Sequence, residues 1–301
     1  MTDIIIIGAG PAGLTAAIYA GRANKTVLIF EAKNYGGKIV NALNVENYPG
    51  FGTISGYELA NNLYEQAKTY GALLKYEKVE HIEDLGNTKK IITNKGEYIC
   101  RAVIIANGVN ERKVNLPNED KFISKGVSYC ATCDGAFFKG KEVVVYGGGN
   151  TAVDDALFLA DYCSKVTLIY RRDKLKAEEK MVDKLVSLPN VEIKYNSVIT
   201  SINGNERLES ITINEKEELL CSGLFIAIGQ VPENNIFGDL IELDQNGYII
   251  SDELCHTKTK GIYVAGDTRE KEYRQLTTAT SDGTIAALTA IKELTWKENV
   301  K

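Results

Sequence analysis

The chain contains the same short unit twice: an apolar strand, a glycine-rich turn, a helix and a second apolar strand. The first turn begins at Gly8 and the second at Gly147. Glu31 and Tyr170 stand at the same distance, 23 residues, after these two glycines, so the two copies are in register. Glycines permit the tight turn and let backbone N–H groups approach a pyrophosphate at the helix N-terminus. The repeat therefore predicts two similar nucleotide-binding α/β folds.

The first copy has every feature of a dinucleotide site. Its strand is expected at 4–7, its helix at 14–22 and its second strand at 26–30. The carboxylate of Glu31, directly after that strand, can accept hydrogen bonds from both hydroxyls of an unphosphorylated ribose. We therefore predict an FAD site here rather than a glycine-rich turn without a ligand. The turn residues expected to contact FAD are Gly8, Gly10, Pro11, Ala12 and Gly13.

The second copy has strands expected at 142–146 and 165–169 and a helix expected at 153–162. It predicts a different nucleotide. Tyr170 replaces the ribose acid and is followed by Arg171 and Arg172, with Lys176 on the same side if the segment is helical. An acid would repel a 2′-phosphate, whereas guanidinium groups bind phosphate bidentately. We therefore predict NADPH rather than NADH, the alternative being a solvated basic surface. The turn residues expected to contact NADPH are Gly147, Gly149, Asn150 and Thr151.

Two closely spaced cysteines, Cys130 and Cys133, stand just before the second copy. Beside nucleotide-binding units, a C-x-x-C motif indicates a redox-active dithiol rather than an inert pair. Zinc would need four ligands, usually including a second close pair. The remaining cysteines and histidines stand singly, at Cys100, Cys163, Cys221, Cys255, His81 and His256. We therefore predict no metal site, and we assign Asp134 as an acid/base group, with a helix cap as its alternative.

The order of the motifs predicts an inserted domain. A last strand at 261–265 runs into Gly266 and Asp267, which suits the ribityl or phosphate part of a flavin. We expect two Rossmann-like, three-layer domains, the second inserted into the first. FAD binds residues 1–112 and 241–301, and NADPH binds 113–240, which also carries the cysteines. Because the dithiol and the nicotinamide share one domain, they are expected to alternate at the flavin by rotation about two linkers.

Composition narrows the partners and the compartment. The net charge is −5, and the apolar and charged contents of 44% and 25% are those of an ordinary globular protein. This balance argues against nucleic acid and favours small molecules or proteins. The first strand starts at Asp3, which leaves no room for a signal peptide, and no run is long enough to cross a membrane. Cysteines without a regular framework suggest the cytoplasm.

Over essentially its whole length the chain resembles the low-molecular-weight, bacterial-type thioredoxin reductases. The resemblance implies a homodimer with one FAD per chain, and electron flow from NADPH through the flavin and the dithiol to thioredoxin. The motifs that carry it are Gly8-x-Gly10-x-x-Gly13, Glu46-Asn47-Tyr48-Pro49-Gly50, Cys130-Ala-Thr-Cys133-Asp134-Gly135, Gly147-Gly-Gly-Asn-Thr-Ala152, Gly266-Asp267 and Tyr273-Arg274-Gln275.

The same resemblance implies roles for single residues. Cys133 would face the flavin, Cys130 would attack the disulfide of thioredoxin, and Asp134 would be the acid/base group. Further FAD contacts are expected from residues outside the first turn. These are Gly37, Lys38, Asn47, Gly266, Asp267, Arg274, Gln275 and Leu276.

Three motifs depart from the pattern of these reductases. Tyr170 and Lys176 replace a histidine and an arginine, Lys38 replaces a glutamine, and Asn107 replaces the threonine of Ala-Thr-Gly. The main alternative is the same reaction fed by reduced ferredoxin instead of NADPH. The motifs are also compatible with a flavin-dependent dithiol oxidase, with a reductase that serves a peroxide-reducing partner, and with a non-enzymatic flavoprotein that senses redox state.

Overall fold

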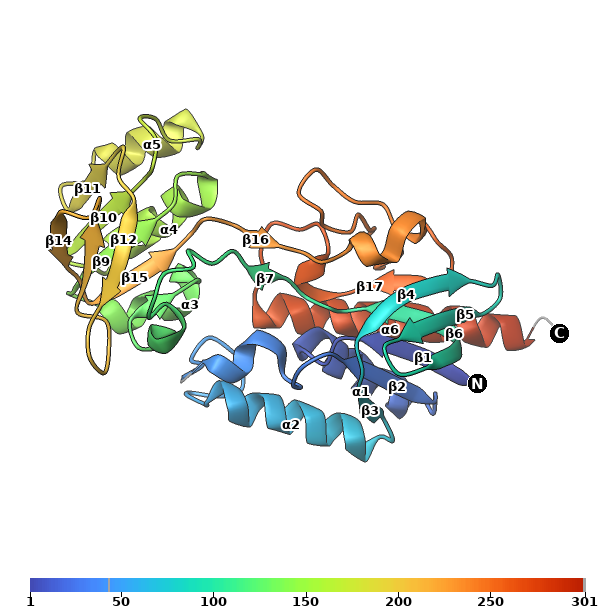
Figure 1. Cartoon of the computed structure of the whole chain (residues 1–301). Helices are drawn as coiled ribbons and strands as arrows, with labels where there is room; N and C mark the ends of the chain where they lie inside the picture. The colour runs from blue at the N-terminus through green and yellow to red at the C-terminus, as the bar shows by residue number, and fades with distance from the viewer. Residues whose placement is uncertain (43, 300–301) are drawn as a thin grey trace. The chain divides into compact units, whose positions relative to one another are not determined.

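The computed structural model describes residues 1–42 and 44–299 and divides into two compact units. The first unit contains residues 1–110 and the chain from 231 onward, and the second contains residues 111–230 (Figure 1). The two connecting segments pair with each other as the short strands β7 (Asn110–Glu111) and β16 (Gln230–Val231). The middle of the chain is thus inserted into a unit built from both of its ends.

The second junction lies earlier than the sequence predicts. The expected boundary at residue 240 places residues 231–240 in the inserted unit, whereas the structure groups them with the first. The physical reason is the short helix η4 (Asn235–Leu240), whose Phe237 is fully buried. Phe237 packs in the same hydrophobic cluster as Ile5 and Ile7 of the first unit, so the chain re-enters that core directly after β16.

A mainly parallel sheet forms the centre of the first unit. Strand β6 lies between β1 and β17, and β2 and β3 extend the parallel part on the far side of β1. The strands β5 and β4 follow β6 in antiparallel order. The strands are β1 (Thr2–Ile7), β2 (Val27–Glu31), β3 (Leu73–Tyr76), β4 (Val79–Asp84), β5 (Lys89–Thr93), β6 (Glu97–Ile105) and β17 (Ile262–Val264).

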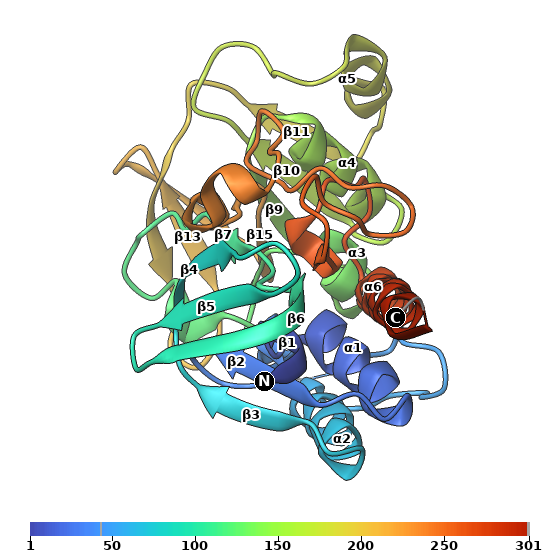
Figure 2. The same ribbon diagram turned by 90° about the vertical axis from the view of Figure 1, so that its right-hand side faces the viewer.

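Alternation along β1 builds the two cores of this unit. Ile4 and Ile6 face the helix layer, in which α1 (Pro11–Arg22) and α6 (Leu276–Asn299) lie side by side (Figure 2). A third helix, α2 (Gly56–Thr69), packs on α1. Ile5 and Ile7 face the opposite layer, formed by β4, β5 and η4. The unit therefore has three layers, as predicted, with strands and a short helix as the outer layer opposite the helices.

The second unit repeats this architecture with a parallel sheet in the order β11-β10-β9-β15-β8. Helices α4 (Asn150–Ala160) and α5 (Glu179–Val186) share a hydrophobic cluster with Val143 and Val145. Val144 faces the antiparallel sheet of β12 (Ile199–Asn203), β13 (Ser210–Ile213) and β14 (Glu217–Leu220). The parallel strands are β8 (Val127–Ser128), β9 (Glu142–Tyr146), β10 (Lys165–Ile169), β11 (Val191–Lys194) and β15 (Gly223–Ile226).

Both helices that follow the glycine-rich turns begin one turn earlier than predicted. Helix α1 starts at Pro11 rather than Leu14, and α4 starts at Asn150 rather than Val153. Gly10 and Gly149 cap them with extended backbone, and proline at the first helical position costs no hydrogen bond. The first N–H groups of each helix are therefore placed directly against the glycines. Among the described residues, no helix is both long and apolar enough to span a bilayer.

A histidine joins the C-terminal half of α6 to the chain before β17. Nδ1 of His256 lies 2.8 Å from Oδ2 of Asp252, and Nε2 lies 2.8 Å from Oε1 of Glu293 in α6. The hydroxyl of Tyr263 donates to the other oxygen of Glu293 at 3.0 Å. Burial opposes the positive charge, but the hydrogen bonds to the two carboxylates outweigh it and raise the pKa of His256.

Replacing His256 with asparagine should therefore destabilise the protein in a pH-dependent way. A raised folded-state pKa contributes stability that is complete below the unfolded value of about 6.5 and is lost as pH rises through the folded value. Thermal denaturation should show a larger loss for H256N at pH 6 than at pH 9. His81, which is exposed on β4, is the matched control. An equal loss for H256N at both pH values would contradict a stabilising interaction between protonated His256 and the carboxylates of Asp252 and Glu293.

Candidate redox site and nucleotide-binding turns

The two cysteines of the C-x-x-C motif form a closed disulfide in the second unit. Cys130 and Cys133 are joined with their Cα atoms 5.3 Å apart. Cys130 caps the short helix α3 (Ala131–Asp134), and its carbonyl oxygen accepts the N–H of Asp134 at 3.1 Å. Cys133 is exposed and Cys130 is half-buried. Within this unit, the turn at the start of α3 therefore positions the disulfide and leaves Cys133 exposed to solvent.

Ser128, at the end of β8, connects the cysteine turn to the neighbouring acid. Its hydroxyl donates to Oδ2 of Asp134 at 2.6 Å and accepts the N–H of Cys130 at 3.1 Å. Burial raises the pKa of Asp134, and the hydrogen bond from Ser128 acts against that rise. Ser128 is not among the residues predicted from the sequence. The available signal was a serine two residues before a helix-capping position, a spacing that favours a local side-chain to backbone bond.

A carboxyl group that the sequence analysis did not single out, that of Asp155, lies on α4, which packs against α3. Burial, reinforced by the neighbouring charge of Asp154, raises the pKa of Asp155 to about 7. Asp155 therefore changes its charge close to neutral pH on the helix that supports the cysteine turn. Nothing in its sequence pattern indicates this, because an acid near the start of a helix is ordinarily solvated.

The first glycine-rich turn is shaped for close approach by a ligand. Gly8 has a φ of 105°, and an added Cβ would lie 2.3 Å from the carbonyl oxygen of Ala106. A Cβ at Gly10 would meet only Cα of Gly37, 4.0 Å away, so the space over the helix N-terminus is open. Glu31 is positioned at this turn, since its Oε2 accepts the N–H of Ala9 at 2.9 Å. These residues suit a pyrophosphate with a ribose beside it.

An unsatisfied oxygen lies at the end of the neighbouring strand β17. Oδ1 of Asp267, in the short helix η5 (Gly266–Thr268), is buried and has no hydrogen-bond partner among the described residues. A buried acceptor without a partner costs about 1–3 kcal/mol, so such atoms in native proteins need an explanation. A hydroxyl or N–H group of FAD would satisfy this one, and the residues of the first unit therefore fit that cofactor.

The other predicted FAD contacts lie at three separate places in the first unit. Gly37 and Lys38 open the short helix η1 (Gly37–Asn41), and an added Cβ at Gly37 would lie 3.2 Å from Cα of Gly10. Gln275 and Leu276 stand at the start of α6. Asn47 lies apart from these contacts, exposed in the loop between Val45 and Ile54. The structure thus brings η1 against the turn and leaves Asn47 in a surface loop.

Arg274 is occupied by contacts within the protein. Its guanidinium lies 3.9 Å from the ring centroid of Tyr248. It also donates to the carbonyl oxygen of Asp267 at 3.1 Å and to that of Arg269 at 3.3 Å. Arg274 therefore holds the Asp267 turn in place, a role that sequence alone did not distinguish from direct contact with FAD.

The second glycine-rich turn differs from the first in the side chain that packs beside it. An added Cβ at Gly148 would lie 2.2 Å from the ring of Tyr170, which is buried against the turn. The aromatic ring thus takes the side of the turn on which Glu31 stands in the first unit. A Cβ at Gly149 would meet nothing within 4 Å, so the helix N-terminus of α4 is open to a ligand.

Lys176 is held at the turn by backbone pairing and not by the helical turn that the sequence predicts. The expected helical turn after Tyr170 is wrong, because residues 171–178 form an irregular segment. A backbone bridge between Lys176 and Gly149 returns the chain, with the N–H of Lys176 donating to the carbonyl oxygen of Gly148 at 2.6 Å. The N–H of Glu178 donates to Oδ1 of Asn150 at 3.0 Å, which fixes the same segment to the start of α4.

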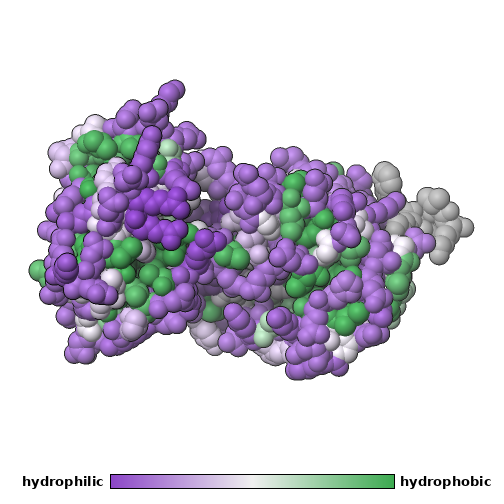
Figure 3. Space-filling model, turned by 45° about the horizontal axis from the view of Figure 1, so that its top comes forward, coloured by the Kyte–Doolittle hydropathy of each residue, from purple (hydrophilic) through white to green (hydrophobic). Residues whose placement is uncertain are grey.

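Arg171, Arg172 and Lys176 are all exposed. Within the described part of the chain, none of their side chains forms an ion pair. Hydrophilic side chains cover most of the face of this unit drawn in Figure 3, with hydrophobic ones in scattered patches. Three cations without carboxylate partners, next to an open helix N-terminus, fit the 2′-phosphate of NADPH.

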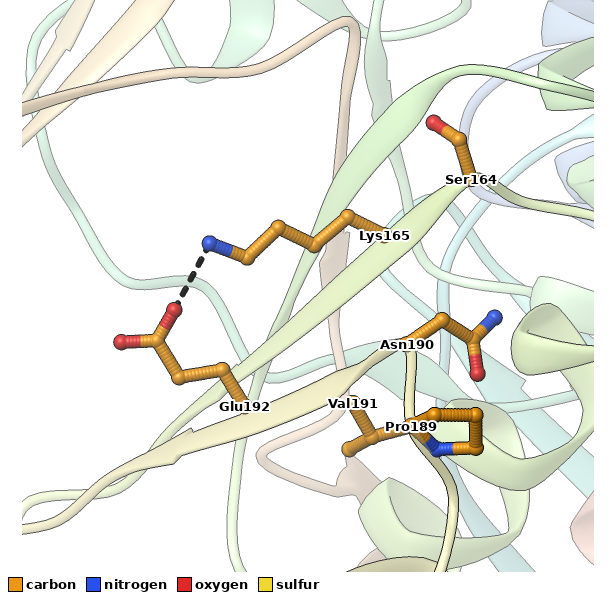
Figure 4. A pocket seen from close by; sticks show the side chains of 6 residues that line it. All are labelled: Ser164, Lys165, Pro189, Asn190, Val191 and Glu192. Carbon is orange, nitrogen blue, oxygen red and sulfur yellow. Dashed lines mark ion pairs between the residues drawn. The ribbon is translucent and has the colours of Figure 1, made fainter.

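A separate pocket in the second unit lies at the wrong end of the sheet for a nucleotide. It has a volume of about 430 Å³ and adjoins the first residues of β10 and β11 (Figure 4). Lys165 and Glu192 form an ion pair of 2.7 Å within it. Ligands of open α/β sheets bind at the carboxyl ends of the strands. This pocket is therefore no part of the nucleotide site.

Comparison with known proteins decides the family. The family described as pyridine nucleotide-disulphide oxidoreductase matches residues 2–283. The chain belongs to this family. The geometry agrees with that assignment, because a pyridine nucleotide-disulphide oxidoreductase needs a nucleotide site and a redox-active disulfide in one molecule.

Individual members of the family match over nearly the whole chain. Thioredoxin reductase of Bacillus subtilis is 44% identical, covering 95% of this chain and 92% of the relative. Thioredoxin reductase of Treponema pallidum is 41% identical, covering 99% and 98%. The crystal structure of thioredoxin reductase from Streptococcus pyogenes is 40% identical, covers 98% of each chain and superposes with a TM-score of 0.94.

Proposed function

We propose that this oxidoreductase reduces the disulfide of thioredoxin with electrons from NADPH, through FAD and the Cys130–Cys133 pair. The observation that carries the proposal is the closed Cys130–Cys133 disulfide, next to which Ser128 accepts the backbone N–H of Cys130 and donates to Asp134. It belongs to a chain with two glycine-rich nucleotide turns of different chemistry, and the full-length relatives named above are thioredoxin reductases. The ribose acid supports FAD in the first unit, and the exposed cations support NADPH in the second.

The proposed FAD contacts come from several segments of the first unit, among them the turn after β1, the short helix η1 and the start of α6. When bound, FAD supplies a two-electron carrier that links a nicotinamide to a disulfide. The residues assigned to it are Gly8, Gly10, Pro11, Ala12, Gly13, Glu31, Gly37, Lys38, Asn47, Gly266, Asp267, Arg274, Gln275 and Leu276. Those assigned to NADPH are Gly147, Gly149, Asn150, Thr151, Arg171, Arg172 and Lys176.

The cysteines carry the exchange with thioredoxin. Two electrons and two protons convert the Cys130–Cys133 disulfide to the dithiol. The Cys130 thiolate then attacks one sulfur of the thioredoxin disulfide, forming a mixed disulfide and releasing the other sulfur as a thiolate. Attack by Cys133 on Sγ of Cys130 restores the internal disulfide and frees the second thioredoxin sulfur. Asp134, whose pKa burial raises, exchanges the protons that these thiols gain and lose.

Replacing Ser128 with alanine should move the pH dependence of this exchange. The Ser128 hydroxyl stabilises the ionised form of Asp134, so its loss should raise the pKa of that carboxyl further. The pH profile of thioredoxin reduction should shift upward in S128A and stay near its original position in S128T, which keeps the hydroxyl. A lower rate with an unmoved profile would show that Ser128 only supports the backbone of Cys130.

The first test of the proposed function is an anaerobic titration of the flavin-loaded protein. NADPH should bleach the flavin absorbance near one equivalent, and NADH should do so much less effectively. If the flavin stays oxidised with NADPH but bleaches with reduced ferredoxin, the donor assignment falls and the dithiol chemistry stands. If neither donor bleaches it, the reductase proposal itself fails.

The proposal also includes a homodimer, a rotation between the two units and a cytoplasmic location. The resemblance to thioredoxin reductases supports a homodimer, which light scattering on the purified protein measures directly. Rotation about the connecting segments β7 and β16 remains a prediction from the order of the motifs. A cytoplasmic location is supported by the cysteines, because Cys100, Cys163, Cys221 and Cys255 are all free thiols in a chain whose Cys130–Cys133 pair is closed.

A further inference from the structure

Asn107 stands at a crowded point of the first unit, directly after β6. An added Cβ at Gly8 would lie 3.0 Å from Cα of Asn107, so the residue touches the first glycine-rich turn. Strand β17 pairs with β6 on the other side, with Val264 opposite Ile105. Continuing that register places Gly266 and Asp267 beside Asn107. An added Cβ at Gly266 would also lie 2.8 Å from Cβ of Ala12, so all three segments meet at the start of α1.

The amide group of Asn107 is used within the protein. Its Nδ2 donates to Oδ1 of Asn234 at 3.1 Å and to the carbonyl oxygen of Glu233 at 3.4 Å. Both acceptors lie just after β16, on the second connecting segment. Asn234 is itself buried and accepts the hydroxyl of Thr268 at 2.8 Å. Asn107 therefore links the end of β6 to the connecting segment and, through Asn234, to the Asp267 turn.

The carbonyl side of the same amide has no such use. Oδ1 of Asn107 is buried and, like Oδ1 of Asp267, lacks a hydrogen-bond partner among the described residues. The orientation of the amide is set by its surroundings, because the oxygens of Glu233 and Asn234 are both acceptors and can pair only with its NH2 group. Two unsatisfied buried oxygens thus stand at the ends of adjacent strands, and both can accept a hydrogen bond from a ligand.

Sheet order decides which part of FAD could reach them. Glu31, the expected ribose contact, ends β2 on one side of β1, whereas Asn107 and Asp267 follow β6 and β17 on the other side. A dinucleotide with its pyrophosphate at the turn after β1 has its adenosine half toward β2. Its flavin half then lies toward β6 and β17, and the donors nearest the pyrophosphate in that half are the ribityl hydroxyls.

We propose that Asn107 binds FAD and the second connecting segment at the same time. Its carbonyl oxygen accepts a hydrogen bond from a ribityl hydroxyl, and its amide holds Asn234 and Glu233, so that cofactor binding orders the segment after β16. The proposal rests on the assignment of FAD to the first unit. It gives a purpose to the asparagine that replaces the usual threonine at this position.

The test uses the full chain, stripped of flavin and reconstituted with FAD. N107L removes both halves of the amide, and N107A does so without adding bulk. Each should weaken FAD binding about tenfold, as measured by quenching of flavin fluorescence. Binding of ADP, which lacks the ribityl and flavin groups, should be unchanged. In the wild type, FAD should slow hydrogen exchange in a peptide covering residues 231–236, and this protection should be lost in both variants.

Asn110, on the first connecting segment, provides the matched control because it also contacts Glu233. Its Nδ2 donates to Oε1 of Glu233 at 2.8 Å, and it is exposed. N110A should bind FAD normally and keep the protection of 231–236 by FAD. Wild-type FAD affinity in N107L and N107A would overturn the cofactor contact, and an equal loss of ADP binding would place the effect outside the ribityl group. Unchanged exchange on FAD binding in the wild type would overturn the coupling, and a wild-type chain that does not bind FAD would instead refute the proposed function.

Discussion

Replacing Cys130 with serine is expected to abolish thioredoxin reduction while leaving reduction of the flavin by NADPH intact. Cys130 supplies the attacking thiolate, and none of the four cysteines outside the disulfide can replace it. The four free cysteines are buried, and burial raises the pKa of Cys163 to about 11 and that of Cys221 to about 12. Turnover with thioredoxin should fall by at least roughly three orders of magnitude, as for loss of other covalent nucleophiles. Steady-state assays and anaerobic absorbance measure the two halves separately.

Cys133→Ser distinguishes the roles of the two cysteines. In that variant Cys130 can still attack thioredoxin, but nothing resolves the mixed disulfide, so a covalent adduct should be visible by mass spectrometry. C130S should form no adduct. Cys163→Ala, at a buried free thiol in the same unit, should leave turnover near that of the wild type. An adduct in C130S and none in C133S would mean that the roles are reversed.

Replacing Arg171 and Arg172 with glutamine should remove the preference for NADPH. Both side chains are exposed and free of ion pairs among the described residues, beside the open N-terminus of α4. Loss of two charge-assisted contacts to a 2′-phosphate should raise the KM for NADPH by roughly 10²- to 10³-fold and change the KM for NADH little. The measurement is KM and kcat for both nucleotides in wild type, R171Q, R172Q and the double variant.

Lys176 and Lys174 make a matched pair for this test. Both are exposed lysines of the same segment, but only Lys176 is held at the turn, through the bond of its N–H to Gly148. Replacement of the Lys176 side chain keeps that backbone bond. K176Q should therefore weaken NADPH binding while K174Q has little effect. Equal losses for NADPH and NADH would show that the segment is structural, and equal losses in K174Q and K176Q would indicate a general charge effect.

The residues that the sequence predicted well are those whose chemistry is local. A glycine at a φ of 105°, as at Gly8, an unbroken apolar strand, and a cysteine pair three residues apart can each be recognised without knowing what packs on them. Strands β9 and β10 begin and end where predicted for the same reason. The predicted helix starts were wrong by one turn, because a glycine-rich turn does not show how soon regular hydrogen bonding begins.

The features that escaped prediction all depend on contacts between distant positions. Ser128 meets Asp134 because α3 folds back on the end of β8, and Asn107 meets Asn234 across more than a hundred residues of sequence. Segment 231–240 belongs to the first unit because Phe237 is buried in its core. The sequence of the segment alone does not indicate which of the two cores Phe237 joins. The helical spacing assumed for Lys176 failed because tertiary pairing replaced it.

The sequence by itself determined the two repeated nucleotide folds, the cysteine pair between them and the different side chains, Glu31 and Tyr170, at the equivalent position of the two repeats. These follow from steric rules and functional groups that act over a few residues. Only the tertiary structure decided which polar groups meet: the serine on Asp134, the tyrosine ring on Gly148, and the unsatisfied oxygens of Asn107 and Asp267 at neighbouring strand ends. Strand order and packing determine those contacts, and neither can be derived from any single stretch of the chain.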